Sequence, residues 1–105
     1  MNDTEFLAFV KERWPANVKV GKTGRVRLTG EALSSLRGHT YMESLERCQN
    51  CAERIFYAAR FAGDPLAYDM AHIKSRGAGG SDLPSNVRAL CHRDHMAEHS
   101  GRRIS

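Results

Sequence analysis

Three cysteines constrain this chain more than any other feature of its sequence. Cys48 and Cys51 form the pair "CQNC", and Cys91 follows 40 residues after the second of them. An odd number of cysteines in a chain without a signal-peptide pattern argues against a disulfide framework, while two intervening residues suit a metal-binding knuckle. Because 105 residues bury only a small core, a bound ion would add needed stability. We therefore expect a zinc-stabilised fold.

The fourth zinc ligand differs in kind from the three thiolates. Structural zinc sites usually take two ligand pairs, each separated by two residues, but Cys91 is followed at that spacing by Asp94. Asp94 in the first turn of a helix can ligate zinc through oxygen. Alternatively, Asp94 only caps the helix, and His92 or water completes the site. The predicted ligand set is Cys48, Cys51, Cys91 and Asp94.

The sequence pattern in the first half of the chain predicts a helix, a hairpin and a second helix. We expect a helix over residues 4–14 with Asp3 or Thr4 as its N-cap and Pro15 at its end. A basic β-hairpin over residues 17–28 and a second helix over residues 29–47 follow. Positions expected to face the core are Phe6, Leu7, Val10, Trp14, Ala32, Leu33, Leu36, Tyr41 and Leu45.

The second half reads as strand, loop, strand and helix. Residues 53–73 favour strands at both ends of a turn at Gly63 to Pro65, with the later strand over residues 67–73. A loop over residues 74–85 and a strand over residues 86–91 come next. A helix then starts at His92, and Gly101 is expected to end it. We expect one domain overall.

Histidines in this half form a second candidate metal site. His95 and His99 are four residues apart, so a helix places both imidazoles on one face, where they can share an ion. His72 ends an apolar stretch and precedes a basic, glycine-rich loop, and Asn86 opens the next strand. The order along the chain is therefore His, Asn, His.

Together these residues resemble the HNH endonuclease family, whose catalytic core is a ββα-metal motif. The resemblance covers Cys48 to Gly101 and is carried by "CQNC", "AHIKSRGAGG", "SNVRALC" and "DHMAEH"; "RVRLTGEALSSLR" is similar to the lead-in of phage-type members. It implies an α+β fold in which residues 48–105 form a small zinc-stabilised ββα-metal core with a zinc-ribbon-like knuckle. Residues 1–47 would be an N-terminal helix and hairpin extension.

The resemblance also implies an activity, the hydrolysis of phosphodiester bonds in DNA by nicking or double-strand cleavage. His72 would be the general base that activates a water molecule, and Asn86 would orient the loop or help to hold the metal. His95, with His99 one turn later, would bind a divalent ion that stabilises the phosphate and the departing 3′ oxygen. These ligands admit Mg²⁺, Mn²⁺, Ni²⁺ or Zn²⁺.

One position departs from the family pattern. Many members carry Asp or His directly before the general base as a metal ligand, but here that residue is Ala71. Asp69 falls on the same strand face as Ala71, so we expect Asp69 to serve as the ligand. The departure also leaves open a zinc-ribbon DNA-binding module that has lost catalysis.

The charge balance favours nucleic acid as the partner. The formal net charge is +4, and arginine, whose planar fork grips phosphates, supplies 12 of the 16 basic residues. Double-stranded DNA is the expected partner, contacted by Lys74, Arg76, Lys19, Lys22, Arg25 and Arg27. Two alternatives remain: a hairpin whose basic face is only solvated, and a small protein-interaction domain with solubilising charges.

The sequence also bears on location and assembly. No apolar run approaches the roughly 20 residues that cross a bilayer, and the N-terminus lacks a signal-peptide cleavage pattern, so we expect a cytoplasmic protein without membrane association. One HNH site normally cuts one strand. Cleavage of both strands would therefore need a homodimer related by two-fold symmetry.

Overall fold

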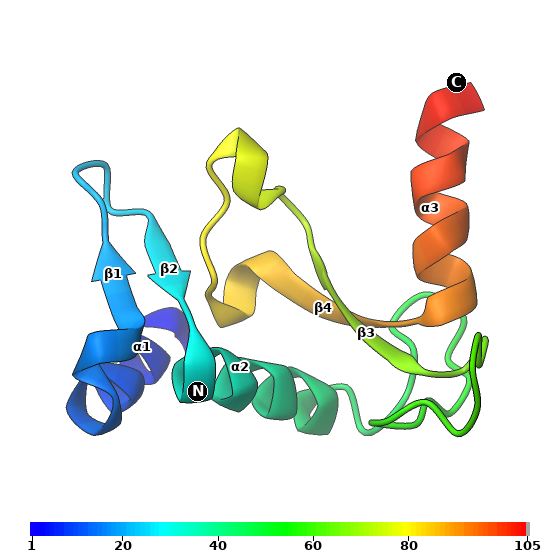
Figure 1. The fold of residues 1–105 in the computed structure, drawn as a ribbon, viewed down its shortest axis with the longest axis horizontal. Helices are drawn as coiled ribbons and strands as arrows, with labels where there is room; N and C mark the ends of the chain where they lie inside the picture. The colour runs from blue at the N-terminus through cyan, green and yellow to red at the C-terminus, as the bar shows by residue number, and fades with distance from the viewer. Residues whose placement is uncertain (105) are drawn as a thin grey trace. The chain divides into compact units, whose positions relative to one another are not determined.

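A computed structural model describes the backbone of residues 1–104 and the side chains of residues 1–98. The elements in chain order (Figure 1) are α1 (Asp3–Arg13), η1 (Pro15–Asn17), β1 (Val18–Val20), β2 (Val26–Leu28), α2 (Gly30–Glu43), β3 (Tyr68–His72), η2 (Arg76–Ala78), η3 (Pro84–Asn86), β4 (Val87–Cys91) and α3 (His92–Ile104). This mixture of helices and short strands confirms the predicted α+β class. None of the described helices combines the length and apolar character needed to span a bilayer.

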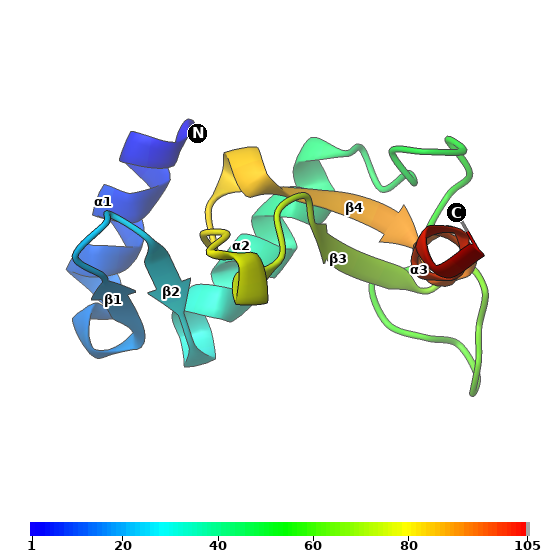
Figure 2. The ribbon, with the colours of Figure 1, turned by 90° about the horizontal axis from the view of Figure 1, so that it is seen from above.

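The chain divides into two compact units. The hairpin unit comprises Met1–Thr40 and His72–Val87, and the cysteine unit comprises Tyr41–Ala71 and Arg88–Ser105. β3 and β4 contribute residues to both units and pair with each other in a two-stranded sheet (Figure 2). The strands are antiparallel. At one end the backbone N–H of Ile73 donates to the carbonyl of Asn86, and at the other end the backbone N–H of His92 donates to the carbonyl of Ala67.

α1 begins slightly earlier than the sequence pattern predicts. Asn2, rather than Asp3 or Thr4, is the N-cap, since its side chain accepts the N–H of Glu5 and the Glu5 carboxylate accepts the N–H of Asn2. Asp3 instead accepts from the N–H and the hydroxyl of Ser85 in η3, at 2.9 and 2.5 Å. This exchange joins the start of α1 to the end of the long loop within the hairpin unit.

β1 and β2 form the predicted hairpin. Their antiparallel register places Lys19 opposite Arg27 and Val20 opposite Val26. Val26 and Leu28 alternate with the basic residues, as a half-buried strand requires, and lie in the core of the hairpin unit. Helix positions confirmed as buried in this core are Phe6, Val10, Ala32 and Leu36, while Leu7, Trp14 and Leu33 are half-buried.

α2 ends at Glu43, four residues before its predicted end at Arg47. Leu45 and Glu46 adopt φ angles of 58° and 60°, a left-handed conformation that stops a helix. Leu45 is consequently 79% exposed, so its predicted place in the core is wrong. Tyr41 does pack against the core of the cysteine unit, and its hydroxyl donates to the carbonyl of Ile55 at 3.0 Å.

Residues 53–67 contain no regular strand, so the earlier of the two strands predicted in this region is wrong. Isolated bridges join Arg47 to Arg54 and Phe56 to Ala67. The turn between them depends on the buried Asp64, whose carboxylate accepts from the Arg60 guanidinium and from the backbone of Arg60 and Leu66. The later strand, β3, is present and is one residue shorter at each end than predicted.

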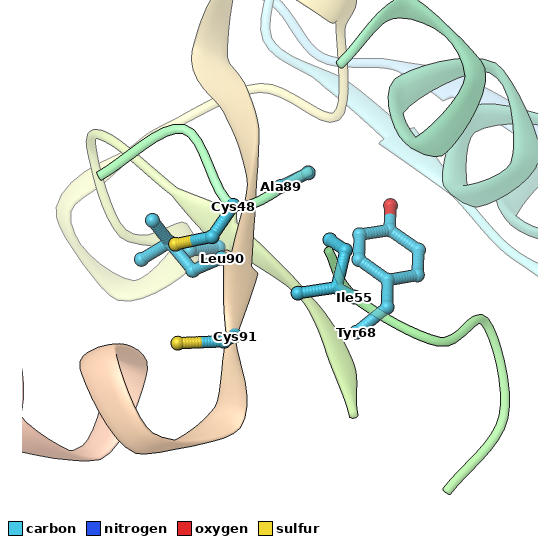
Figure 3. Packing of buried hydrophobic residues seen from close by; sticks show 7 residues of the cluster. Cys48, Ile55, Tyr68, Ala89, Leu90 and Cys91 are labelled. Carbon is cyan, nitrogen blue, oxygen red and sulfur yellow. The ribbon is translucent and has the colours of Figure 1, made fainter. Parts of the chain in front are cut away.

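The core of the cysteine unit forms around β3 and β4. It consists of Cys48, Ile55, Tyr68, Ala71, Ala89, Leu90 and Cys91. Figure 3 shows the sulfur atoms of Cys48 and Cys91 pointing the same way, away from the ring of Tyr68. α3 starts at the predicted residue but runs past Gly101 to Ile104. Glycine weakens a helix interior by about 1 kcal/mol and does not end it by itself.

Candidate functional site

The predicted zinc ligands lie together in the cysteine unit. One ligand atom from each of Cys48, Cys51, Cys91 and Asp94 lies within 4.8 Å of the other three. Cys51 Sγ is 4.0 Å from Cys91 Sγ, and Cys48 Sγ is 3.5 Å from Asp94 Oδ2. Thiolates about 2.3 Å from a tetrahedral zinc ion lie about 3.8 Å apart, so these residues fit zinc.

Backbone hydrogen bonds shape this group. The N–H of Gln49 donates to the carbonyl of Ala89 at 2.8 Å, and the Gln49 side chain accepts the N–H of Ala89 at 2.6 Å. The cysteine pair is thereby bound to β4, which ends in Cys91. Backbone N–H groups also point at the sulfurs of Cys48 and Cys91, each at 3.4 Å. Donors aimed at sulfur favour the thiolate, which is the form that binds metal.

The electrostatics of this group favour a bound cation. Burial acts to raise the pKa of Cys48, but several backbone hydrogen bonds outweigh burial and lower it. Burial raises the pKa of Cys91 to about 12, and the neighbouring Cys48 thiolate contributes to the rise. The Asn50 amide, 3.1 Å away, lowers the pKa of Asp94 to about 2. A divalent cation would stabilise these crowded negative charges and displace the remaining thiol protons.

A second group of ligand atoms in the cysteine unit is centred on Asp69. Its Oδ2 lies 2.8 Å from Nδ1 of His92 and 2.9 Å from Nδ1 of His95. These are hydrogen-bond distances, and a carboxylate with imidazoles is also a donor set that divalent transition ions accept. Asp69 and His95, predicted as ligands of one ion, are thus in contact. The side chain of His99 lies outside the described residues.

His92 lies in this second group rather than among the thiolates. The hydrogen bond from its backbone N–H to Ala67 at the sheet edge sets His92 beside β3, where Asp69 is located. The sequence offered His92 only as an alternative zinc ligand. Its spacing of three residues from His95 on one helix was the signal for a shared role, because such residues lie on the same face.

In the hairpin unit, His72 at the end of β3 contacts the buried Asp82. Nε2 of His72 lies 2.8 Å from Asp82 Oδ1, and the His72 side chain is 18% exposed. Arg76, predicted to contact DNA, donates to both carboxylate oxygens of Asp82. No periodicity or spacing in the sequence singles out Asp82, which lies in a segment read as loop, so sequence reasoning missed it.

Asn86 organises the glycine-rich loop of the same unit. Its side-chain amide donates to the carbonyls of Lys74 and Ser81, both at 2.9 Å, and its Oδ1 accepts the N–H of Lys74 at 2.9 Å. The loop closes so tightly that a Cβ on Gly80 would lie 1.9 Å from the Lys74 carbonyl oxygen. These bonds support the loop-orienting role among the two roles predicted for Asn86. The side chain of Lys74 is exposed beside this closure.

The basic hairpin residues lie on and beside the β1–β2 ladder. Lys19 is directly opposite Arg27, with Lys19 exposed and Arg27 half-buried. Arg25, also half-buried, precedes β2, and Lys22 is exposed in the turn. Like charges directly opposite each other destabilise a strand pair, and a polyanion would relieve that repulsion.

The second half of the chain matches a known protein family. Residues 48–101 match the model of the family described as HNH endonuclease, and these 54 residues are just over half of the 105. The chain belongs to the HNH endonuclease family. No curated protein and no solved structure matches this HNH protein.

Membership of this family indicates the type of cofactor and the type of substrate. HNH endonucleases use divalent metal ions and act on DNA, and the matched stretch of this HNH protein contains the cysteine group that could hold a metal ion and the contact between Asp69 and His95. It also contains His72 and Asn86, which belong to the hairpin unit, and Asp69 and His95, which belong to the cysteine unit. The match starts at Cys48, the residue at which the sequence pattern places the start of the core.

Proposed function

We propose that this HNH protein is a metal-dependent endonuclease that hydrolyses phosphodiester bonds in DNA. The observation that carries the proposal is the 2.9 Å separation between Asp69 Oδ2 and His95 Nδ1. Ala71 stands where many family members have a metal ligand, which is the reason to consider a catalytically inactive DNA-binding module. Asp69, two residues before Ala71, contacts His95. This contact supports Asp69 as the ligand that takes the place of residue 71, and therefore supports an active enzyme.

His72 is the proposed general base. A neutral imidazole accepts a proton near physiological pH, and the water that gives up this proton attacks the phosphorus. Asn86 keeps the loop after β3 closed through its three side-chain hydrogen bonds. His95 contributes through the metal, and His72, Asn86 and His95 form the proposed catalytic set.

Asp69, His95 and His99 are the proposed ligands of the catalytic ion, which is Mg²⁺, Mn²⁺, Ni²⁺ or Zn²⁺. When bound, such an ion supplies Lewis-acid stabilisation of the charge on the phosphate and on the departing 3′ oxygen. The carboxylate of Asp69 also contacts His92, so one carboxylate orients both His92 and His95 on α3. Asp69 is thus the residue on which this site depends most.

We further propose that Cys48, Cys51, Cys91 and Asp94 hold a structural zinc ion in a zinc-ribbon-like knuckle. Residues 48–105 would then be the zinc-stabilised nuclease core, and residues 1–47 an extension that carries the basic hairpin. Three free cysteines in the described chain suit the reducing cytoplasm, which is the proposed location.

Double-stranded DNA is the proposed substrate, contacted by Lys74, Arg76, Arg25 and Arg27. The side chain of Lys74 is exposed at the start of the loop. Arg76 is 36% exposed while it pairs with Asp82, which leaves part of its guanidinium for phosphate. These contacts position the backbone of the duplex rather than read its sequence.

The direct test is plasmid cleavage by zinc-loaded protein with Mg²⁺, Mn²⁺, Ni²⁺ or added Zn²⁺. We expect metal-dependent conversion of supercoiled DNA, and a loss of at least about 10²-fold in His72→Ala. His39→Ala is the matched control, because His39 lies on α2 against Phe6, at 5.7 Å between ring centroids, and has no proposed role. Open-circle or linear product reports whether one or two strands are cut.

Two outcomes would contradict the proposal. Cleavage by His72→Ala at the wild-type rate would remove His72 as the base. A protein that shifts DNA in a salt-sensitive manner but cuts with none of the four ions is the inactive binding module, with Ala71 as the reason.

A further inference from the structure

Asp82 is a buried carboxylate whose acceptor positions are all in use. Oδ1 lies 2.8 Å from His72 Nε2 and accepts from Arg76 Nε at 2.9 Å. Oδ2 accepts from Arg76 Nη2 at 2.6 Å and from the backbone N–H of Leu28 at 2.8 Å. An ionised carboxylate has about four lone-pair positions, and four nitrogens from β2, β3 and the loop occupy them. Its 0% exposure leaves this arrangement closed to water.

These neighbours keep Asp82 ionised. Burial alone would raise its pKa, but the Arg76 guanidinium, the N–H of Leu28 and His72 outweigh burial and keep the pKa of Asp82 below its usual range. An ionised carboxylate accepts hydrogen bonds and donates none. The contact between His72 Nε2 and Asp82 therefore requires that Nε2 carries the hydrogen.

We propose that Asp82 is a positioning residue that orients His72 and fixes its tautomer, so that Nδ1 is the atom that takes the proton from the attacking water. The proposal rests on the nuclease function proposed above. A neutral imidazole carries one hydrogen, so a hydrogen fixed on Nε2 leaves the lone pair on Nδ1. Arg76 orients Asp82 in turn through both carboxylate oxygens.

The substitution Asp82→Asn is a sharp test because an amide cannot serve all four donors. Its single oxygen must face the backbone N–H of Leu28, which cannot turn away, and the adjacent Arg76 Nη2. The amide NH₂ then occupies the place of Oδ1 and donates to His72 Nε2. This reverses the tautomer and puts the hydrogen on Nδ1, as happens when Asn replaces the aspartate of a serine-protease triad.

The experiment combines ¹⁵N–¹H correlation spectra of the histidine rings, at alkaline pH, with single-turnover cleavage of plasmid DNA in Mg²⁺. We expect the wild-type His72 ring to carry its hydrogen on Nε2 and the Asp82→Asn ring to carry it on Nδ1. The cleavage rate at saturating DNA should fall by about 10²–10⁴-fold, with the half-saturating DNA concentration little changed. A purely structural role for Asp82 would leave the tautomer unmoved.

Asp64→Asn is the matched control. Asp64 is also a buried aspartate, 1% exposed, that accepts two hydrogen bonds from one arginine side chain, here Arg60. The control should lose stability and keep the wild-type His72 tautomer and cleavage rate.

Several results would overturn the proposal. One is a wild-type ring with the hydrogen on Nδ1, a measurement that needs no variant to fold. Another is a folded Asp82→Asn protein with the wild-type tautomer and rate. If the wild-type protein shows the expected tautomer yet cuts no DNA, the nuclease function fails while the control of His72 by Asp82 stands.

Discussion

The sulfur atoms of Cys51 and Cys91 lie 4.0 Å apart, although the two residues are separated by 40 positions in the chain. A disulfide has an S–S length of about 2.05 Å, so the two sulfurs are not bonded. Thiolates that share a tetrahedral zinc ion lie about 3.8 Å apart. The start of the matched HNH stretch and the end of β4 therefore meet in a group that could hold a metal ion, and we expect folding of the cysteine unit to depend on zinc.

Loss of one thiolate should unfold the cysteine unit. We expect Cys48→Ser to lose zinc and its cooperative thermal transition, because apparent binding free energies of structural zinc are about 10–16 kcal/mol at neutral pH. Metal analysis and circular dichroism measure the two effects. Glu53→Gln is the control, since Glu53 lies 4.0 Å from Cys51 Sγ but is outside the ligand set. A Cys48→Ser protein with wild-type zinc content and Tm would refute the structural site.

The catalytic ion should depend on Asp69. In zinc-loaded protein, we expect Asp69→Ala to weaken Mn²⁺ binding by at least about 10–100-fold, because it removes a proposed ligand and the acceptor shared by His92 and His95. Electron paramagnetic resonance of free Mn²⁺ measures the affinity without reference to cleavage. Glu98→Gln on α3 is the control, since Glu98 pairs with Arg88 instead. Equal Mn²⁺ affinity in Asp69→Ala and wild type would exclude Asp69 as a ligand.

The sequence predicted the fold well wherever local patterns decide it. Alternation of apolar and basic residues located β2, and the 3.6-residue stripe located the buried Phe6 and Val10. The end of α2 was missed because Leu45 and Glu46 are compatible with a helix and adopt positive φ only in the folded chain. Residues 53–67 were misread because the Asp64 and Arg60 pair, rather than strand pairing, orders the turn.

For the candidate sites, the sequence predicted which residues could be ligands but did not predict which other residues contact the site residues. The spacing of the cysteines predicted the group that includes Asp94, and strand alternation pointed to Asp69, which contacts His95; the role of Asp69 as a metal ligand stays a prediction. Asp82 could not be found in this way. Its partners Leu28 and His72 come from two different strands, and no spacing along the chain reports that three-way contact.

Acid should destabilise the cysteine unit partly through Asp64. The Arg60 guanidinium, opposed by burial, keeps the pKa of Asp64 well below the unfolded value of about 3.9. Asp64 therefore releases its proton more readily in the folded state than in the unfolded state. Its contribution to the free energy of unfolding is complete above about pH 4 and is lost as the pH falls toward the folded pKa. The difference in unfolding free energy between wild type and Asp64→Asn, from urea titrations, should be largest at pH 6 and shrink toward pH 2.5. A difference that stays constant with pH would exclude Asp64 as the titrating group.

DNA affinity should depend on the charge of the hairpin and on salt. Lys19 and Arg27 face each other across β1 and β2, so a DNA backbone that reaches one is expected to reach both. In the His72→Ala background, we expect Lys19→Gln with Arg27→Gln to reduce the slope of log affinity against log salt by about 1.8, since each phosphate contact contributes about 0.9. Lys11→Gln with Arg13→Gln removes the same charge from the last turn of α1 and is the control. Fluorescence anisotropy over a salt series measures both slopes. Equal slopes for the two double variants would mean that the hairpin face is only solvated and that net charge alone attracts DNA.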